Sequence, residues 1–524
     1  MRALTHPATI AFGLTNLYLL SLTWPLISSG HDRVYRLAGS ASVIFIPVMV
    51  YLLALWVLLA ALLTLVQRWE RPRRVIWAAS ILIMPWILLT AFAGFFEFDV
   101  PHWGRFLVWL ASSIAFLLIV APKGPLRRAF EAVQPLVSTV LGTVALLGVV
   151  IFAQLLWFGW QARDLNPGTS LHRAQAATDP PRQRIIWIVL DELSYQQVYE
   201  RRFPGLELPA FDRLAEQSTV FTRVAPGGKF TREVIPALFT GIPVDGLSVS
   251  GAGLLTAVHD NSSGKWRRFD EHQTVFQDAL DRGYSTGIAG WYNPYCRIMP
   301  GVLDHCYWMY REDTPGRFSA YGSVESNLVA PFHRLALYLR HRFGLGTGSP
   351  SEEQLDIKMH SADYRDLLNV GDAFLRDPSI TFLFLHMPVP HPLGFYDRKN
   401  RRVAARHTSY IDNLALADLY LGHVQALLER EGQWDSSTVV VMGDHSWRTS
   451  LIWAHSAGWT PEDRAASRGG QFDERPAYLV KLPNQHSAAR VNEKFSAMRT
   501  RALFDVLFAG RLQTPEQLQR WVQQ

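Results

Sequence analysis

Long apolar runs fill the first third of the chain and give way to a mixed pattern near residue 160. A helix that crosses a bilayer needs about 20 mostly apolar residues. Five runs reach that length, at 7–28, 41–66, 75–96, 104–121 and 135–158. The first is the weakest, because Thr, Asn and Ser interrupt it. We therefore predict a transmembrane domain of five helices over residues 1–158.

The charges of the loops predict which way these spans cross the membrane. Two loops, between spans two and three and between spans four and five, are basic, with Arg68, Arg71, Arg73, Arg74, Lys123, Arg127 and Arg128. Basic loops stay in the cytoplasm. With five spans the N-terminus is then cytoplasmic and the C-terminal part extracytoplasmic. No span carries a charged residue deep in its apolar run, which favours an anchor over a transporter; a lipid-handling role remains open beside a plain tether.

After residue 160 the pattern is that of an α/β protein. Residues 159–183 are polar and rich in Pro and Gly, which predicts a linker before a domain at 184–524. Short apolar runs at 185–190 and 438–442 are bounded by polar residues and indicate buried parallel strands. The chain is thus expected to have an exported α/β domain behind its membrane part.

Both of these strands end in residues that can bind a metal. Asp191 and Glu192 follow the first strand, and Asp444 and His445 follow the second. Open α/β sheets carry their chemistry at the carboxyl ends of strands. A glycine-rich stretch, 227–230, delivers the hydroxyl of Thr231 to the start of a predicted helix, near the positive end of the helix dipole. The combination suggests a metal-activated Thr nucleophile.

Composition narrows the choice of partners. The net charge of +6 is modest, and basic residues lie largely beside the predicted spans, so nucleic acid is not an expected partner. The chain has two cysteines, which excludes a Cys-rich zinc module. Because Cys296 and Cys306 lie close together in a domain expected in an oxidising compartment, we predict a loop disulfide between them.

Several motifs, taken in order, carry a resemblance to a known family. They are Asp191-Glu192, the stretch 208–214 (LPAFDRL), Phe221-Thr222, Thr231, the stretch 237–241 (ALFTG), Gly443-Asp444-His445 and the stretch 474–483 (ERPAYLVKLP). Their order and spacing over residues 184–485 resemble the alkaline phosphatase/sulfatase superfamily. The resemblance implies an α/β sulfatase-like domain with a central mixed, mostly parallel sheet.

The residue at the nucleophile position separates the branches of this superfamily. True sulfatases carry a Cys that is oxidised to formylglycine, followed four residues later by Arg. This chain has Thr231 and Ile235 at those positions. A Thr there, behind five spans, resembles the membrane-anchored phosphoethanolamine transferases and lipoteichoic acid synthases.

The resemblance also implies roles for individual residues. In those transferases the strand-end acid, the Thr and the Asp-His pair are metal ligands, which correspond here to Asp191, Thr231, Asp444 and His445. Glu192 is either a further ligand or a brace for the site. Ligation by oxygen and imidazole suits Zn²⁺ or Mn²⁺.

Further polar residues are candidates for substrate contacts. His391 lies in a His-Pro segment similar to one in the family and is expected to contact phosphate or protonate a leaving group; His386 is expected to be structural. His455 is a second catalytic candidate, with a surface role as the alternative. Lys229 and Arg232 flank Thr231 and are candidates for holding phosphate oxygens.

These expectations lead to one preferred function and two alternatives. The preferred function is transfer of phosphoethanolamine or phosphoglycerol from a membrane phospholipid, through Thr231, to an envelope glycan or lipid, at a bacterial inner membrane with the catalytic domain in the periplasm. The alternatives are a sulfatase-like hydrolase or phosphodiesterase, and a non-catalytic lipid-sensing regulator. The oligomeric state stays open.

Overall fold

The computed structural model describes residues 3–27, 32–95, 101–163, 168–173, 183–311, 323–342, 352–456 and 458–524. The chain divides into two units. One comprises residues 1–34, 40–165 and 317–331 and is helical; the other comprises residues 35–39, 166–316 and 332–524 and contains the sheets. The predicted boundaries at 158 and 183 differ from this division. In it, residues 35–39 belong to the unit with the sheets and residues 317–331 belong to the helical unit.

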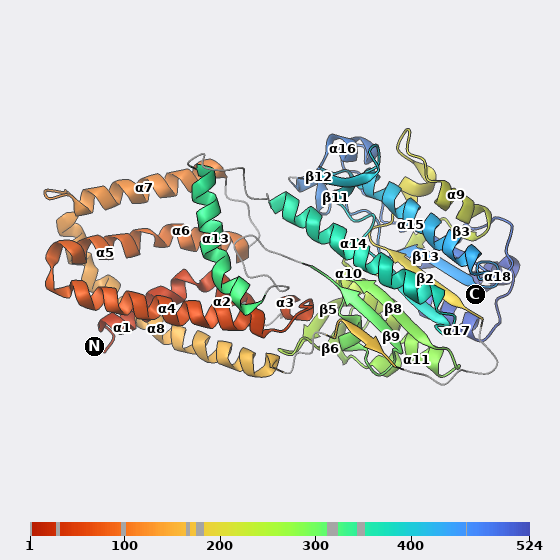
Figure 1. Ribbon diagram of the computed structural model, residues 1–524, viewed down its shortest axis with the longest axis horizontal. Helices are drawn as coiled ribbons and strands as arrows, with labels where there is room; N and C mark the ends of the chain where they lie inside the picture. Colours follow the sequence, from red (N-terminus) through yellow and green to blue (C-terminus); the bar gives the residue numbers. More distant parts are fainter. Residues whose placement is uncertain are drawn as a thin grey trace. The chain divides into compact units, whose positions relative to one another are not determined.

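The helical unit consists of helices joined by short turns (Figure 1). They are α1 (Pro7–Tyr18), α2 (Leu20–Ile27), α4 (Ser42–Leu65), η1 (Val66–Arg68), α5 (Glu70–Leu82), α6 (Met84–Phe95), α7 (His102–Val120), α8 (Arg127–Ala162) and the first part of α13 (Val324–Arg342). The short helix α3 (Asp32–Tyr35) lies between α2 and α4 in the chain, and the division between the two units falls within it. Many large apolar side chains on these helices are exposed, such as Leu58 (62%) and Leu136 (65%). Exposed apolar surface on this scale marks a membrane or partner contact.

Four helices of the described residues are long and apolar enough to cross a membrane, at 42–68, 70–89, 103–120 and 127–162. They correspond to predicted spans two to five and indicate a membrane protein. A fifth span is not confirmed. The first predicted span, 7–28, is divided at Leu19 into α1 with 12 residues and α2 with 8.

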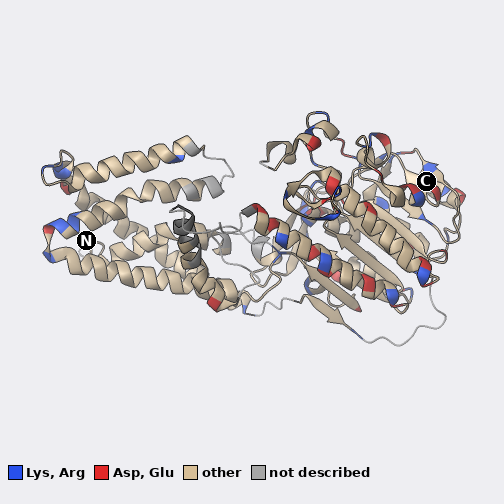
Figure 2. Cartoon of the chain, turned by 45° about the horizontal axis from the view of Figure 1, so that its top comes forward, with Lys and Arg blue, Asp and Glu red and all other residues tan. Residues whose placement is uncertain are grey.

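The basic turns of the helical unit lie at one end of it. Figure 2 shows few charged residues along its helices and a concentration of Lys and Arg at the turns. Arg74, the fifth residue of α5, donates from its Nε to Glu131 near the start of α8, at 3.1 Å. Arg127 also contacts Glu131, at 3.1 Å. The two basic turns therefore share one side of the bundle, as the positive-inside argument requires.

The α/β unit is built on a nine-stranded sheet in the order β1-β9-β8-β10-β2-β13-β14-β3-β15. Its strands are β1 (Ser170–His172), β2 (Ile185–Leu190), β3 (Thr219–Phe221), β8 (Thr286–Trp291), β9 (His305–Met309), β10 (Phe382–Met387), β13 (Thr438–Gly443), β14 (Tyr478–Lys481) and β15 (Ala489–Val491). The central strands β9, β8, β10, β2 and β13 run parallel, whereas β1 and β14 are antiparallel to their neighbours. The predicted mixed, mostly parallel sheet is confirmed.

Smaller sheets and helices complete the unit. The remaining strands are β4 (Val224–Ala225), β5 (Val244–Val249), β6 (Leu255–Asp260), β7 (Lys265–Arg268), β11 (Gly394–Asp397), β12 (Arg402–Thr408) and β16 (Phe495–Ser496). The helices are η2 (Gln196–Glu200), α9 (Pro209–Glu216), α10 (Thr231–Thr240), η3 (Glu271–Gln273), α11 (Val275–Leu280), α12 (Tyr295–Ile298), α14 (Glu352–Arg376), α15 (Tyr410–Arg430), η4 (Trp453–His455), α16 (Pro461–Ala466), η5 (Ala497–Arg499), α17 (Thr500–Phe508) and α18 (Pro515–Gln523).

Helices cover both faces of the central sheet, which explains why β2 reads as a continuous apolar run. All six residues of β2 are buried. Ile186, Ile188 and Leu190 belong to the core that includes residues of α9, α14 and α15. On the other face Trp187 packs edge-on against Phe239 of α10, at 5.7 Å between ring centroids, and against Phe384 at 4.8 Å. The covered faces leave the strand ends as the place for chemistry.

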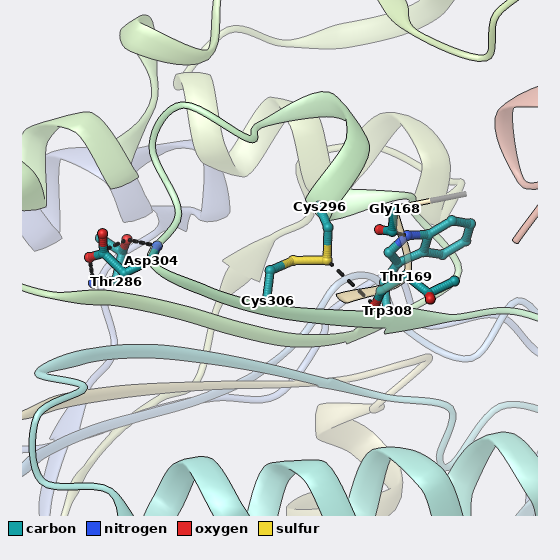
Figure 3. The surroundings of a disulfide bond; sticks show 7 residues. All are labelled: Gly168, Thr169, Thr286, Cys296, Asp304, Cys306 and Trp308. Atoms are coloured by element: carbon teal, nitrogen blue, oxygen red, sulfur yellow. Dashed lines mark hydrogen bonds between the residues drawn. A yellow bond between two sulfur atoms is a disulfide. The ribbon is translucent and has the colours of Figure 1, made fainter. Parts of the chain in front are cut away.

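Part of the predicted linker is structured. Helix α8 continues to Ala162, and β1 pairs with β9 inside the α/β unit. A disulfide between Cys296 and Cys306, with a Cα–Cα distance of 5.6 Å, joins α12 to β9 close to this strand (Figure 3). Beside it, the indole of Trp308 donates to the Gly168 carbonyl at 2.8 Å. The disulfide thus stabilises the sheet edge formed by β1 and β9, where the chain first joins the sheet.

Candidate active site

The site forms where β2 and β13 end side by side. Leu190 pairs with Gly443 in parallel register, so the residues that follow, Asp191-Glu192 and Asp444-His445, come out at the same sheet edge. Helix α10 begins at Thr231, and its hydroxyl lies 3.4 Å from Asp191 Oδ2 and 3.3 Å from His445 Nε2. The structure therefore brings together residues that are up to 254 positions apart in the chain.

The hydrogen bonds of His445 determine which of its ring nitrogens carries a proton. Nδ1 lies 3.1 Å from the Ser446 carbonyl, which accepts only, so Nδ1 carries the hydrogen. Nε2 then presents a lone pair toward Thr231. Burial lowers the pKa of His445 to about 3, so the ring is neutral at physiological pH. A neutral imidazole with its lone pair in the site is the form that binds a cation.

Glu192 is held by a buried cation. Its carboxylate accepts from the backbone N–H of Arg448 at 3.0 Å and from Nε of Arg448 at 2.8 Å. The indole Nε1 of Trp453 also donates to it, at 2.9 Å. Glu192 and Arg448 are both buried. These contacts suit the bracing role of Glu192, although its carboxylate also lies with Asp191 and His445 in a group that can hold a metal ion.

Three residues near the strand ends adopt a strained backbone conformation. Glu192 after β2, Tyr292 after β8 and Leu393 after β10 have φ values of 64°, 73° and 61°. A non-glycine residue in this region costs about 1–3 kcal/mol, and such residues concentrate at functional sites. At Glu192 this geometry sends the chain away from the strand while its side chain reaches Arg448.

The site's charge and its unpaired atoms fit a divalent cation. Asp191, Glu192 and Asp444 are fully buried, and with Arg448 they leave a formal charge of −2. Asp191 Oδ1 and Asp444 Oδ2 are buried without a hydrogen-bond partner. Burial, and then the charges of Asp444 and Glu192, hold the pKa of Asp191 well above its usual range. A dication would offset this charge and occupy the unpaired oxygens.

Removal of divalent metal with a chelator is expected to lower the unfolding temperature, because the buried carboxylates then repel one another. Metal present at 100 times its dissociation constant contributes about 2.7 kcal/mol. Thermal unfolding of the full-length protein in detergent, with chelator or with added Zn²⁺ or Mn²⁺, measures this difference. Asp444→Asn should largely remove the sensitivity; equal unfolding temperatures of the wild type in both conditions would contradict the expectation.

Behind Thr231 the chain is held by a segment from near the N-terminus. The Tyr35 hydroxyl donates to Asn293 Oδ1 at 3.1 Å, and Asn293 Nδ2 donates to the Thr231 carbonyl at 3.4 Å. Arg297 donates to the carbonyls of Tyr35 and Leu37, the latter at 2.8 Å. The segment 35–39 thereby becomes part of the α/β unit and supports the nucleophile from behind.

His391 lies in the loop after β10, against the rings of Trp291 and Trp453 at 5.4 and 5.2 Å between centroids. Its Nδ1 is 2.9 Å from the Pro392 carbonyl and therefore carries the hydrogen, which leaves Nε2 as an acceptor. Burial, assisted by Arg448, holds the pKa of His391 well below its usual range. The ring is therefore neutral and a weak base, with Nε2 as a hydrogen-bond acceptor.

The other predicted contacts fall further from the nucleophile. Lys229 is exposed, and its carbonyl accepts from Arg448 at 3.3 Å. Arg232 contacts Glu233 at 3.2 Å, and its side chain is 39% exposed. His455 is exposed at the end of η4. None of these three side chains has a described contact with the cluster around Thr231.

Two further residues, Arg448 and His386, lie beside the cluster. Arg448 was not singled out, although it follows His445 by three positions in the same loop. The pair Asp191-Glu192 was a usable signal, because a second buried acid needs a cation. His386, expected to be structural, has its Nε2 4.0 Å from Asp191 Oδ2. A His inside a strand carries no sequence signal for such a position.

A hydroxyl at a helix start, facing carboxylates and imidazoles at the edge of a mostly parallel sheet, is an arrangement suited to metal-assisted chemistry through a hydroxyl group. The sequence model of the family described as Sulfatase matches residues 183–477. The chain belongs to the sulfatase family, and its predicted membership of this superfamily is confirmed.

Solved structures with some similarity include three enzymes or enzyme relatives. The phosphonate monoester hydrolase of Agrobacterium radiobacter is 14% identical, with 63% of this chain and 74% of that chain covered and a TM-score of 0.38. The lipoteichoic acid synthase LtaP from Listeria monocytogenes is 14% identical (66% and 78%; TM-score 0.37). A protein in the alkaline phosphatase superfamily from Vibrio parahaemolyticus is 14% identical (67% and 72%; TM-score 0.37). No curated protein matches the sequence.

Proposed function

We propose that this protein is a membrane-anchored transferase that moves a phosphorylated headgroup, phosphoethanolamine or phosphoglycerol, from a phospholipid to an envelope glycan or lipid. The observation that carries the proposal is the Thr231 hydroxyl, which faces Asp191 and His445 at the first residue of α10. A threonine cannot become formylglycine, so it favours phosphoryl over sulfuryl transfer. The apolar helices provide the anchor that brings a lipid donor within reach.

Thr231 is the nucleophile in this proposal. A divalent cation held by Asp191, Asp444 and His445 would lower the pKa of the Thr231 hydroxyl and offset charge on the phosphoryl group. Thr231 is the first residue of α10, where the positive end of the helix dipole favours a negatively charged phosphoryl group. The bond from Thr231 Oγ1 to phosphorus forms, the bond from phosphorus to the diacylglycerol oxygen breaks, and the proton lost by Thr231 ends on that leaving oxygen, which departs as an alcohol.

The second half of the reaction reverses these roles. The acceptor hydroxyl attacks phosphorus, the bond from phosphorus to Thr231 Oγ1 breaks, and the threonine oxygen regains a proton. In this proposal His391 Nε2, an acceptor nitrogen on a ring that packs beside Trp453, accepts a hydrogen bond from the incoming hydroxyl, and the proton of that hydroxyl ends on Thr231 Oγ1. Arg448 holds Glu192 and keeps the site from carrying an excess of negative charge.

The topology of the helical unit supports an extracytoplasmic site. Each basic turn joins two candidate spans, and both turns lie at one end of the bundle. The last span, 127–162, starts at this end, so Ala162 lies on the opposite side of the membrane. This argument holds whether or not the segment 7–27 crosses. We therefore propose a bacterial inner membrane with the α/β domain in the periplasm.

Hydrolysis is the second candidate, favoured by the match to the sulfatase family. A hydrolase and a transferase share the steps up to the Thr231 intermediate and differ in whether water or an envelope hydroxyl resolves it. The products distinguish them: a free phosphorylated headgroup indicates hydrolysis, and a modified acceptor indicates transfer.

Mass spectrometry of the full-length protein tests the proposal. The protein is incubated in bilayers of phosphatidylethanolamine and phosphatidylglycerol with Zn²⁺ or Mn²⁺ and cleaved after glutamate, which releases Thr231 in the peptide 217–233. A headgroup-sized adduct on Thr231, absent from Thr231→Ala and present in Thr222→Ala, is expected. Bound metal without an adduct or any released diacylglycerol would overturn the proposal.

A further inference from the structure

His386 is an unusual residue for the middle of a sheet. It is the fifth residue of β10 and pairs with Val189 of β2 and Gly290 of β8. Its side chain is fully buried. A buried neutral imidazole still has one donor and one acceptor nitrogen, and both need a partner.

One ring nitrogen has a partner and the other has none. Nδ1 lies 2.7 Å from the Tyr295 hydroxyl. Nε2 is buried without a hydrogen-bond partner. The nearest carboxylate oxygen, Asp191 Oδ2, is 4.0 Å away, which is too long for a hydrogen bond. Two ligand atoms that bind the same cation can, however, lie this far apart.

The unpaired Nε2 is part of a group of unpaired atoms. Asp191 Oδ1 and Asp444 Oδ2 are also buried without a hydrogen bond, and Asp444 Oδ2 lies 3.1 Å from His445 Nε2, whose lone pair faces the same place. One ligand atom from each of Asp191, His386 and Asp444 lies within 4.8 Å of the others. Each unpaired buried polar atom costs about 1–3 kcal/mol, so three in one place indicate one shared partner. A cation satisfies two carboxylates and an imidazole lone pair together.

Tyr295 has the position of a residue that orients a metal-binding histidine. If Nδ1–H donates to the Tyr295 oxygen, Nε2 presents its lone pair to Asp191 and Asp444. The Tyr295 ring fits here because position 290 is glycine; a Cβ there would lie 2.3 Å from Tyr295 Cε2. The absence of a side chain at Gly290 thus allows the Tyr295 ring its position, and the Tyr295 hydroxyl in turn orients the His386 imidazole.

We propose that His386 Nε2 is a metal ligand of this site, together with Asp191 and Asp444, and that Tyr295 is its positioning residue. The inference rests on the metal site of the proposed function; because Asp191 belongs both to this group and to the group that contains His445, it adds a second imidazole to the site. A donor set with two imidazoles favours Zn²⁺ over Mn²⁺, because Mn²⁺ prefers carboxylate and water oxygens. His386 therefore sets metal preference as well as affinity.

Metal binding to the full-length protein in detergent tests this role. The X-ray absorption spectrum of the Zn²⁺-loaded wild type is expected to show two imidazole ligands, and that of His386→Gln one. Chelator competition should show a loss of about 10–100-fold in Zn²⁺ affinity for His386→Gln, and about tenfold for Tyr295→Phe. Mn²⁺ affinity should fall less than Zn²⁺ affinity, which a merely structural role would not produce.

His423→Gln is the matched control. His423 lies on α15 and pairs with Asp372, at 2.8 Å, away from the cluster. Its substitution should leave Zn²⁺ affinity within about twofold. If His386→Gln does not fold, the imidazole number in the wild type and the affinity of Tyr295→Phe decide the question.

The outcomes separate this inference from the proposed function. One imidazole in the wild type, or a Zn²⁺ affinity of His386→Gln within twofold of the wild type, overturns the role of His386 and leaves the proposed function intact. A wild-type protein that binds neither Zn²⁺ nor Mn²⁺ overturns the metal site itself and with it the proposed function.

Discussion

Replacement of Thr231 by alanine is expected to reduce turnover of the phospholipid donor by at least about a thousandfold, because a hydroxyl nucleophile has no substitute in the site. The described side chains that face Thr231 Oγ1 are Asp191 and His445, and neither carries another hydroxyl. Release of diacylglycerol from labelled phospholipid, with bound metal measured in the same sample, gives the result.

Two variants control for effects on folding. Thr231→Ser keeps the hydroxyl and should retain a measurable part of the activity. Thr240→Ala removes a hydroxyl from the other end of the same helix, where it bonds to the Pro236 carbonyl at 2.8 Å, and should leave turnover nearly unchanged. Turnover by Thr231→Ala near the wild-type rate would show that another group, or water, attacks phosphorus.

Replacement of Arg448 by methionine is expected to lower the free energy of unfolding by about 3–5 kcal/mol, because it leaves the buried carboxylate of Glu192 without its cation. Glu192 is fully buried and Arg448 is 7% exposed. Without the guanidinium of Arg448, no positive charge would offset the three buried carboxylates of the site, Asp191, Glu192 and Asp444. Denaturant unfolding of the full-length protein in detergent measures the loss.

The double variant Glu192→Gln with Arg448→Met distinguishes charge from packing. It removes both charges, so it should recover much of the stability that Arg448→Met loses. Arg202→Met is the matched control: Arg202 and Asp212 contact each other at 2.6 Å with side chains 27% and 50% exposed. Such a surface pair contributes about 0–1 kcal/mol. Equal losses for Arg448→Met and Arg202→Met would refute the buried-pair argument.

Local pattern was sufficient for the parts of the molecule that depend on neighbouring residues. The apolar runs of β2 and β13 predicted buried strands, and the polar residues directly after them predicted a site at the sheet edge. Four of the five predicted spans correspond to helices of sufficient length. The first is not confirmed, since the run is divided at Leu19 and hydropathy alone does not detect such a division.

The sequence by itself thus determined the strand ends at which Asp191, Asp444 and His445 lie and the helix start at Thr231, because strand, turn and helix signals are local. Only the tertiary structure decided that Arg448 pairs with Glu192, that His386 presents Nε2 toward Asp191, and that residues 35–39 join the α/β unit. The physical reason is that a partner for a buried charge or ring nitrogen is chosen by distance in space. That distance depends on how strands β2, β10 and β13 lie side by side in the folded sheet.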